Sequence, residues 1–204
     1  MKKPEKELAE IKSMMERSTR FLSLSGLAGI LAGIYALLAA GLAYLLIYYP
    51  GAPYGYEISA IQEEKTLNKL VSMALLVLCL AVGTAWFLSR RKSEQKAHPF
   101  WTPAGKRFVL ALFIPVVTGA AFCLALTVQG QFALVAPATL IFYGLGLLNA
   151  SHFTLSDTRY LGFGQLILGL FAGFFPDYGL LLWTLGFGSL HIIYGTLMYL
   201  KYDR

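Results

Sequence analysis

Six long stretches of this sequence contain no charged residue, and this pattern constrains the fold more than any other feature. All 17 Lys and Arg residues and all 11 Asp and Glu residues lie outside them. A bilayer core about 30 Å thick is crossed by roughly 20 apolar residues in a helix. Backbone polar groups in lipid must be satisfied within their own segment, so each stretch is expected to be a helix. The stretches are Phe21–Tyr49, Leu70–Ser89, Phe108–Val128, Gln131–Ser151, Tyr160–Pro176 and Tyr178–Leu200.

This pattern predicts an all-α, polytopic membrane protein, a helical bundle of six transmembrane helices. The hydrophobic fraction of 57% agrees with that class. The pieces between the helices are too short to form a separate soluble core. The charged segment 1–20 followed by a long apolar run differs from a cleavable signal peptide, so the first helix is expected to be retained. We therefore predict a leader, residues 1–20, and a transmembrane domain, residues 21–204.

The basic residues are concentrated on alternate loops of this arrangement. Fifteen of the 17 Lys and Arg residues fall on one side, and the other side has only Lys65 and Lys69. The positive-inside rule then predicts that both termini face the cytoplasm, as in a multi-pass protein of a bacterial inner membrane. Anionic membrane lipids are the expected counter-charge for the net charge of +6, and nucleic acid is not an expected partner.

The leader itself carries an amphipathic helical pattern over residues 4–20. Leu8, Ile11 and Met15 recur at helical spacing and form one apolar stripe. We expect this segment to lie on the inner leaflet before the first transmembrane helix. The alternative is a docking surface that recruits a cytoplasmic protein.

The unusual polar residues are concentrated in the last three helices. Asn149 lies at the inner end of the fourth helix, Gln165 about 8 Å into the fifth, and His191 about 14 Å into the sixth. Gln165 and His191 each share a helix face with small residues, so the two faces are expected to contact each other. An imidazole without partners is costly among acyl chains, so His191 is expected to face the bundle. There it either makes an interhelical hydrogen bond or belongs to a site for ligand binding or proton transfer.

The leading hypothesis is a non-enzymatic protein that binds a small or lipid-like ligand among these helices, as a sensor, regulatory subunit or facilitator. Hydrogen bonds would come from His191, Gln165 and Asn149, and apolar walls from Tyr194, Trp183 and Phe153. No cofactor or resident metal is expected. Coupled ion transport is disfavoured because the apolar stretches contain no Asp, Glu, Lys or Arg. Small residues on the first helix also allow a homo-oligomer, without fixing its stoichiometry.

The alternative from another class is a metal-dependent intramembrane hydrolase. His152, Asp157 and His191 are of the types that bind zinc, which needs three protein ligands and an open position for water. However, no HExxH spacing is present, and Asp157 also fits a helix cap before the fifth helix.

Two stretches, Asn149–Asp157 and Gly186–Tyr202, together about an eighth of the chain, resemble those of a family of small, uncharacterised six-helix integral membrane proteins of bacteria. The resemblance implies the fold predicted above. It implies no activity and no functional residues.

Overall fold

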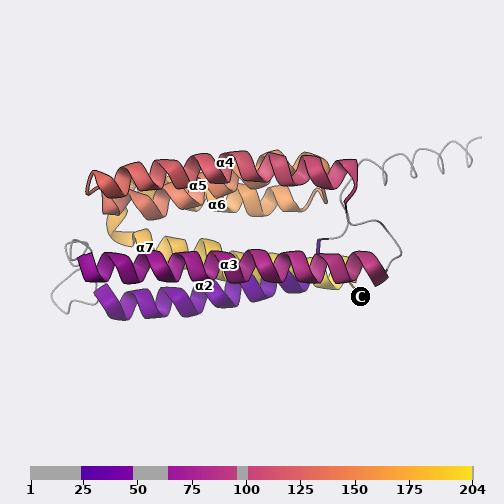
Figure 1. Ribbon diagram of the computed structural model, residues 1–204, viewed down its shortest axis with the longest axis horizontal. Coiled ribbons are helices and arrows are strands. Elements are labelled where there is room, and N and C mark those ends of the chain that lie inside the picture. Colours follow the sequence, from indigo (N-terminus) through magenta and orange to yellow (C-terminus); the bar gives the residue numbers. More distant parts are fainter. Residues whose placement is uncertain (1–23, 48–63, 96–100, 204) are drawn as a thin grey trace, which may run out of the picture.

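The computed structural model describes residues 24–47, 64–95 and 101–203, and the described chain is helical, without strands (Figure 1). Five helical segments in it are long and apolar enough to cross a membrane, and a sixth apolar helix, α6, has 17 residues. The prediction of an all-helical bundle with several helices long and apolar enough to span a membrane is confirmed. The predicted leader, residues 1–20, lies outside the described residues.

The described helices follow one another with short connections wherever the connection is itself described. They are α2 (Gly26–Ile47), α3 (Glu64–Gln95), α4 (Pro103–Val128), η3 (Phe132–Leu134), α5 (Val135–Ala150), η4 (Ser151–Phe153), α6 (Thr158–Phe174), η5 (Pro176–Tyr178), α7 (Gly179–Trp183), η6 (Thr184–Leu190), α8 (His191–Met198) and η7 (Tyr199–Asp203).

The elements from η5 to η7 join into one long segment, Pro176–Asp203, which we call the last helix. Within it, η6 and η7 are π-helical, with wider turns than an α-helix. Such wider turns are rare in proteins, and they occur often at functional sites.

Local sequence signals set the helix boundaries. The side-chain oxygen of Thr102 accepts a hydrogen bond from the backbone N–H of Gly105 at 3.0 Å, and Pro103 occupies the first position of α4. Gly130 takes a positive φ of 72° in the turn between α4 and η3, where a side chain would be strained. The helix α6 ends at Phe174, and Phe175 leaves the helical conformation directly before Pro176.

The helices are arranged in two layers. Figure 1 shows α4, α5 and α6 in one layer, and α2, α3 and the last helix in the other. Within the first layer α5 packs against both α4 and α6, and in the second α2 packs against both α3 and the last helix. The last helix also contacts α5 and α6, so it connects the layers.

Glycine brings two pairs of helices into backbone contact. A Cβ added to Gly33 on α2 would lie 2.7 Å from the carbonyl oxygen of Gly188 on the last helix. A Cβ added to Gly144 on α5 would lie 2.9 Å from the carbonyl oxygen of Gly162 on α6. Close approach through small residues is a common way of packing helices in membranes, where lipid provides no hydrophobic driving force between them.

Most of α3 is covered by no other described part of the protein. Its most apolar 18-residue window contains no buried residue, and its buried residues Ser89, Lys92 and Ser93 lie near its C-terminal end. A largely exposed apolar helix is a poor fit to water and a good fit to acyl chains. The exposure of α3 therefore supports a membrane environment.

Candidate functional site

A cluster of polar groups lies where α5, α6 and the last helix pack together. The Nε2 atom of His191 is 2.9 Å from the hydroxyl oxygen of Tyr143 on α5, and its Nδ1 atom is 3.1 Å from the carbonyl oxygen of Gly186. The same carbonyl accepts a hydrogen bond of 2.8 Å from the side-chain amide of Gln165 on α6. His191 and Gln165 are both buried. We call these four residues the polar junction.

The partners of His191 fix the position of its proton. The carbonyl oxygen of Gly186 is only an acceptor, so Nδ1 of His191 carries the hydrogen and donates it. A charged imidazole buried without a counter-charge is costly, which favours the neutral form, and in that form Nε2 accepts a hydrogen bond from the hydroxyl of Tyr143. Gln165 Nε2 lies 3.3 Å from Nδ1, but both groups are donors in this arrangement, so they do not bond each other. The imidazole is therefore neutral, with both nitrogens satisfied inside the protein.

The side-chain carbonyl oxygen of Gln165 is different, because it has no hydrogen-bond partner although the residue is 0% exposed. Leaving a buried polar atom unpaired costs about 1–3 kcal/mol, and such atoms are uncommon in native proteins. Turning the amide over would not remove this cost. It would bring the oxygen to 3.3 Å from the donor Nδ1 of His191. However, it would also place the oxygen 2.8 Å from the carbonyl oxygen of Gly186, where two acceptors repel each other, and the amide would lose its own bond to that carbonyl. The unpaired acceptor is therefore a property of this arrangement.

Gly186, which lies in the π-helical segment η6, provides the space for this contact. A Cβ added to Gly186 would lie 2.6 Å from the side-chain oxygen of Gln165 and 2.5 Å from a methyl carbon of Leu140, so a larger residue here would displace both side chains. Gly186 thus contributes both a shared acceptor and the absence of a side chain.

Aromatic rings cover one side of the junction. The ring of Phe187 stacks on His191 with centroids 5.8 Å apart and an angle of 13° between the planes. Tyr143 and Trp183 contact Phe187 with centroid distances of 5.2 and 5.0 Å. The sequence predicts Trp183 as a wall of the site. It does not single out Tyr143, although a tyrosine in the middle of an apolar segment needs a hydrogen-bond partner and could be found by that signal.

The other predicted ligand residues lie elsewhere. The hydroxyl of Tyr194 bonds that of Thr158 at 2.8 Å, at the start of α6. The side-chain amide of Asn149 donates to the carbonyl oxygen of Ala111 on α4 at 2.9 Å, and Phe153 packs against a small apolar cluster that includes Ala111. The structure therefore brings His191, Gln165 and Trp183 to the junction, and it places Asn149 and Phe153 against α4.

The three residues predicted for a metal-dependent hydrolase do not form a metal centre. Among the described residues, no group of three or more His, Cys, Asp or Glu side chains could hold a metal ion. Both ring nitrogens of His191 have partners within the junction. His152 is exposed in η4, and Asp157 binds residues at the end of the last helix. The structure described here therefore does not bring these three residues together, and a metal centre built on them stays a prediction.

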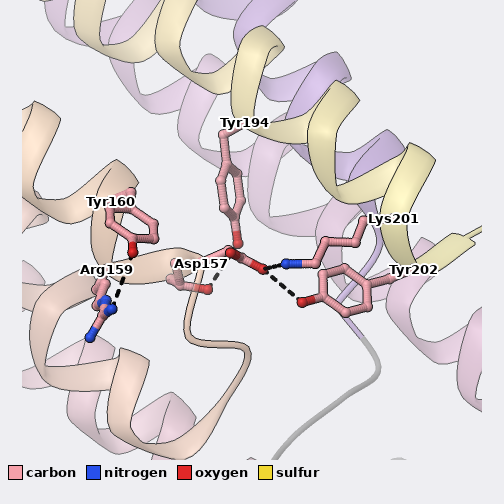
Figure 2. A network of polar contacts seen from close by, with 7 residues as sticks. Asp157, Arg159, Tyr160, Tyr194, Lys201 and Tyr202 are labelled. Atoms are coloured by element: carbon pink, nitrogen blue, oxygen red, sulfur yellow. Dashed lines mark hydrogen bonds and ion pairs between the residues drawn. The ribbon is translucent and has the colours of Figure 1, made fainter.

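Asp157 also does not act as the predicted helix cap, since its side chain makes no capping hydrogen bond. Figure 2 shows its carboxylate accepting hydrogen bonds from Lys201 Nζ at 2.9 Å and from the hydroxyl of Tyr202 at 2.7 Å. These donors, Lys201 first, lower the pKa of Asp157 below its usual range. The contact ties the start of α6 to the end of the last helix.

A second ionic contact lies at the same end of the bundle and is not predicted by the sequence. Lys92 Nζ and the carboxylate of Asp203 are 2.5 Å apart, and each side chain is only 9% exposed. Lys92 also donates to the carbonyl oxygen of Leu24 at 2.6 Å, and Asp203 accepts from the backbone N–H of Gly26 at 2.7 Å. This ion pair joins α3, the start of α2 and the end of the last helix.

Comparison of the chain with family models, curated proteins and solved structures gave no match. The geometry of the polar junction is therefore the basis for the functional proposal.

Proposed function

We propose that this is a non-enzymatic membrane protein that binds a small ligand at the polar junction of α5, α6 and the last helix. The observation that carries the proposal is the unpaired, fully buried carbonyl oxygen of Gln165. A ligand that donates a hydrogen bond to this oxygen would recover the free energy lost by leaving it unpaired. The role would be that of a sensor, a regulatory subunit or a facilitator.

The surroundings favour a neutral ligand with an apolar body. Within the described part of the chain, the hydrogen bonds that define the junction involve no charged side chain, and a neutral His191 gives no counter-charge. His191 lies 12 residues before Asp203 in the last helix, about 18 Å along its axis, so the junction lies deep in the bilayer. The rings of Phe187 and Tyr143 offer flat apolar surfaces. A small alcohol, amide or lipid-like molecule fits this chemistry.

The described conformation is closed. The side-chain oxygen of Gln165 is covered by Gly186, so a ligand reaches it only when the last helix and α6 separate locally. Binding would then select an opened form of the junction.

We also propose that α6 is a sixth crossing and that both termini face the cytoplasm of a bacterial inner membrane. The backbone N–H of Gly26 bonds Asp203, so the first described helix begins at the end where the last one finishes, as an even number of crossings requires. The end of α3 meets Asp203 through Lys92, the start of α6 meets Lys201 through Asp157, and Leu24 packs against an apolar cluster that includes Phe108, near the start of α4. These helix ends carry most of the described basic residues, namely Arg90, Arg91, Lys92, Lys106, Arg107, Arg159 and Lys201. Labelling of single cysteines from either side of the membrane tests this topology.

The ligand proposal is tested by thermal unfolding before and after detergent washing that strips small bound molecules. A ligand at 100 times its Kd stabilises its protein by about 2.7 kcal/mol. We expect the wild type to lose stability on washing and to regain it when the concentrated wash extract is returned. Gln165→Leu should show neither change. Thr196→Val, which removes a hydroxyl that bonds only its own helix, is the matched control and should behave as wild type. An identical response of Gln165→Leu and wild type would contradict the proposal.

A further inference from the structure

The last helix has two interfaces of different physical character. Toward α2, glycines bring backbone against backbone, and a Cβ added to Gly195 would lie 2.7 Å from the carbonyl oxygen of Gly26. Gly33 and Gly188 make the same kind of contact further along. The side chains of Ile192 and Leu37 also pack here, but no change of rotamer can relieve an overlap of backbone with backbone, so relative sliding meets steric resistance.

Toward α5 and α6, the last helix instead uses separate side-chain hydrogen bonds along its length. The first two, within the polar junction, join Gly186 to Gln165 and His191 to Tyr143, and we call the whole row the polar seam. The row continues with Tyr194 to Thr158, and ends with Lys201 and Tyr202 to Asp157 (Figure 2).

The opposite side of the seam is also built on a glycine contact. Gly144 and Gly162 hold α5 and α6 together, and a Cβ added to Gly169 on α6 would lie 2.9 Å from the backbone nitrogen of Ile141 on α5. The bundle therefore consists of two units, each built around one helix pair in close backbone contact, namely α2 with the last helix and α5 with α6. α3 belongs to the first unit through its packing on α2 and the ion pair of Lys92 with Asp203, and α4 belongs to the second through its packing on α5.

We propose that these two units move as rigid bodies and separate along the polar seam from the cytoplasmic end, which exposes the polar junction. The hydrogen bonds of the seam can be broken one after another and replaced by bonds to water or a ligand. Helices in close backbone contact have no such replacement when they separate, so each of those pairs is expected to move as one body. The contact of Asp157 with Lys201 is the latch of this motion because it closes the seam at the membrane surface, where Lys201 is 58% exposed and accessible to water. The relevance of this opening to ligand access rests on the proposed function, but the motion itself does not.

Distances between pairs of spin labels in lipid nanodiscs test the motion without any ligand. Cys79 and Cys123 are first replaced by alanine in the full chain. Labels at the exposed positions Gln95 and Ser156 then report across the seam, and labels at Gln95 and Leu200 report within one unit. The seam is weakened by combining Asp157→Asn with Tyr143→Phe, while Thr196→Val is the control.

We expect the weakened variant to gain a population with longer Gln95–Ser156 distances, and to keep the wild-type distribution for Gln95–Leu200. An unchanged cross-seam distribution would overturn the proposal. Equal broadening of both pairs would also overturn it, because the units would then not be rigid. If the seam opens while washing leaves the stability of the wild type unchanged, the motion stands and the ligand proposal fails.

Discussion

Replacing Lys92 by methionine leaves the carboxylate of Asp203 buried without its cation. Among the described residues, the backbone N–H of Gly26, at 2.7 Å, and the more distant hydroxyl of Ser25 are then its remaining donors. Breaking a buried ion pair by removing one partner costs about 3–5 kcal/mol, because an uncompensated charge stays buried. Both side chains are 9% exposed at a helix end, so we expect the lower value, about 3 kcal/mol.

The double variant separates this cost from the loss of packing. Asp203→Asn keeps an oxygen that accepts from Gly26, and with Lys92→Met it removes both charges, leaving the lost bond to Leu24 as the main deficit. We expect the double variant to cost about 1 kcal/mol, much less than the sum of the two single variants. Arg90→Met is the control, since its pair with Glu94 is more than half exposed and contributes under about 1 kcal/mol.

Reversible unfolding in mixed micelles of mild detergent and dodecyl sulfate gives these free energies. The reasoning is refuted if Lys92→Met costs no more than Arg90→Met. It is equally refuted if the effects of Lys92→Met and Asp203→Asn simply add, because a buried ion pair requires coupling between its members.

Other contacts in the bundle give three more expected outcomes. Gly33→Leu should lower the free energy of unfolding by about 3 kcal/mol, because the new side chain meets the backbone of the last helix. The control Gly41→Leu should change it by less than about 1 kcal/mol, because no atom lies within 4 Å of a Cβ added there. Similar values for the two variants in the same micelle titration would contradict the backbone contact at Gly33. The hydrogen bond from Lys201 lowers the pKa of Asp157, so the ionised carboxylate should stabilise the fold fully above about pH 4 and lose this effect as the pH falls through the lowered pKa. The difference in free energy of unfolding between wild type and Asp157→Asn should therefore shrink in acid. A difference that stays constant with pH would exclude the contact of Asp157 with Lys201. Gly186→Ala should displace the side chain of Gln165 and cost about 2 kcal/mol, and an unfolding midpoint equal to that of wild type would show that the helices do not approach as described.

The fold class follows from sequence because lipid imposes a strong physical constraint. A segment without charges that is long enough to cross the bilayer has few alternatives to a helix, and the described helices confirm that prediction. The rare wide turns of η6 and η7 have no comparable signal, since their residues also fit an α-helix. The continuation of the last helix through Asp203 is not predicted either, because Lys201 and Asp203 resemble surface charges beyond a helix end.

The proximity of Gln165 and His191 was predictable from sequence, but the direction in which other polar side chains point was not. Gln165 and His191 could be brought together because both share a face with small residues at similar depth. Asn149 lies at the inner end of α5, but it points to α4, and nothing in its sequence neighbourhood distinguishes the two directions. Asp157 fitted a helix cap equally well on local pattern, and only tertiary contact with Lys201 decides its role.

Native mass spectrometry of the protein released gently from its own membrane tests the ligand site most directly, because it detects a retained molecule whatever its chemical identity. We expect one neutral small molecule bound per chain in the wild type and in Thr196→Val, and its loss from Gln165→Leu. A wild-type protein without such a molecule, or the same molecule retained equally by Gln165→Leu, would contradict the polar junction as a ligand site.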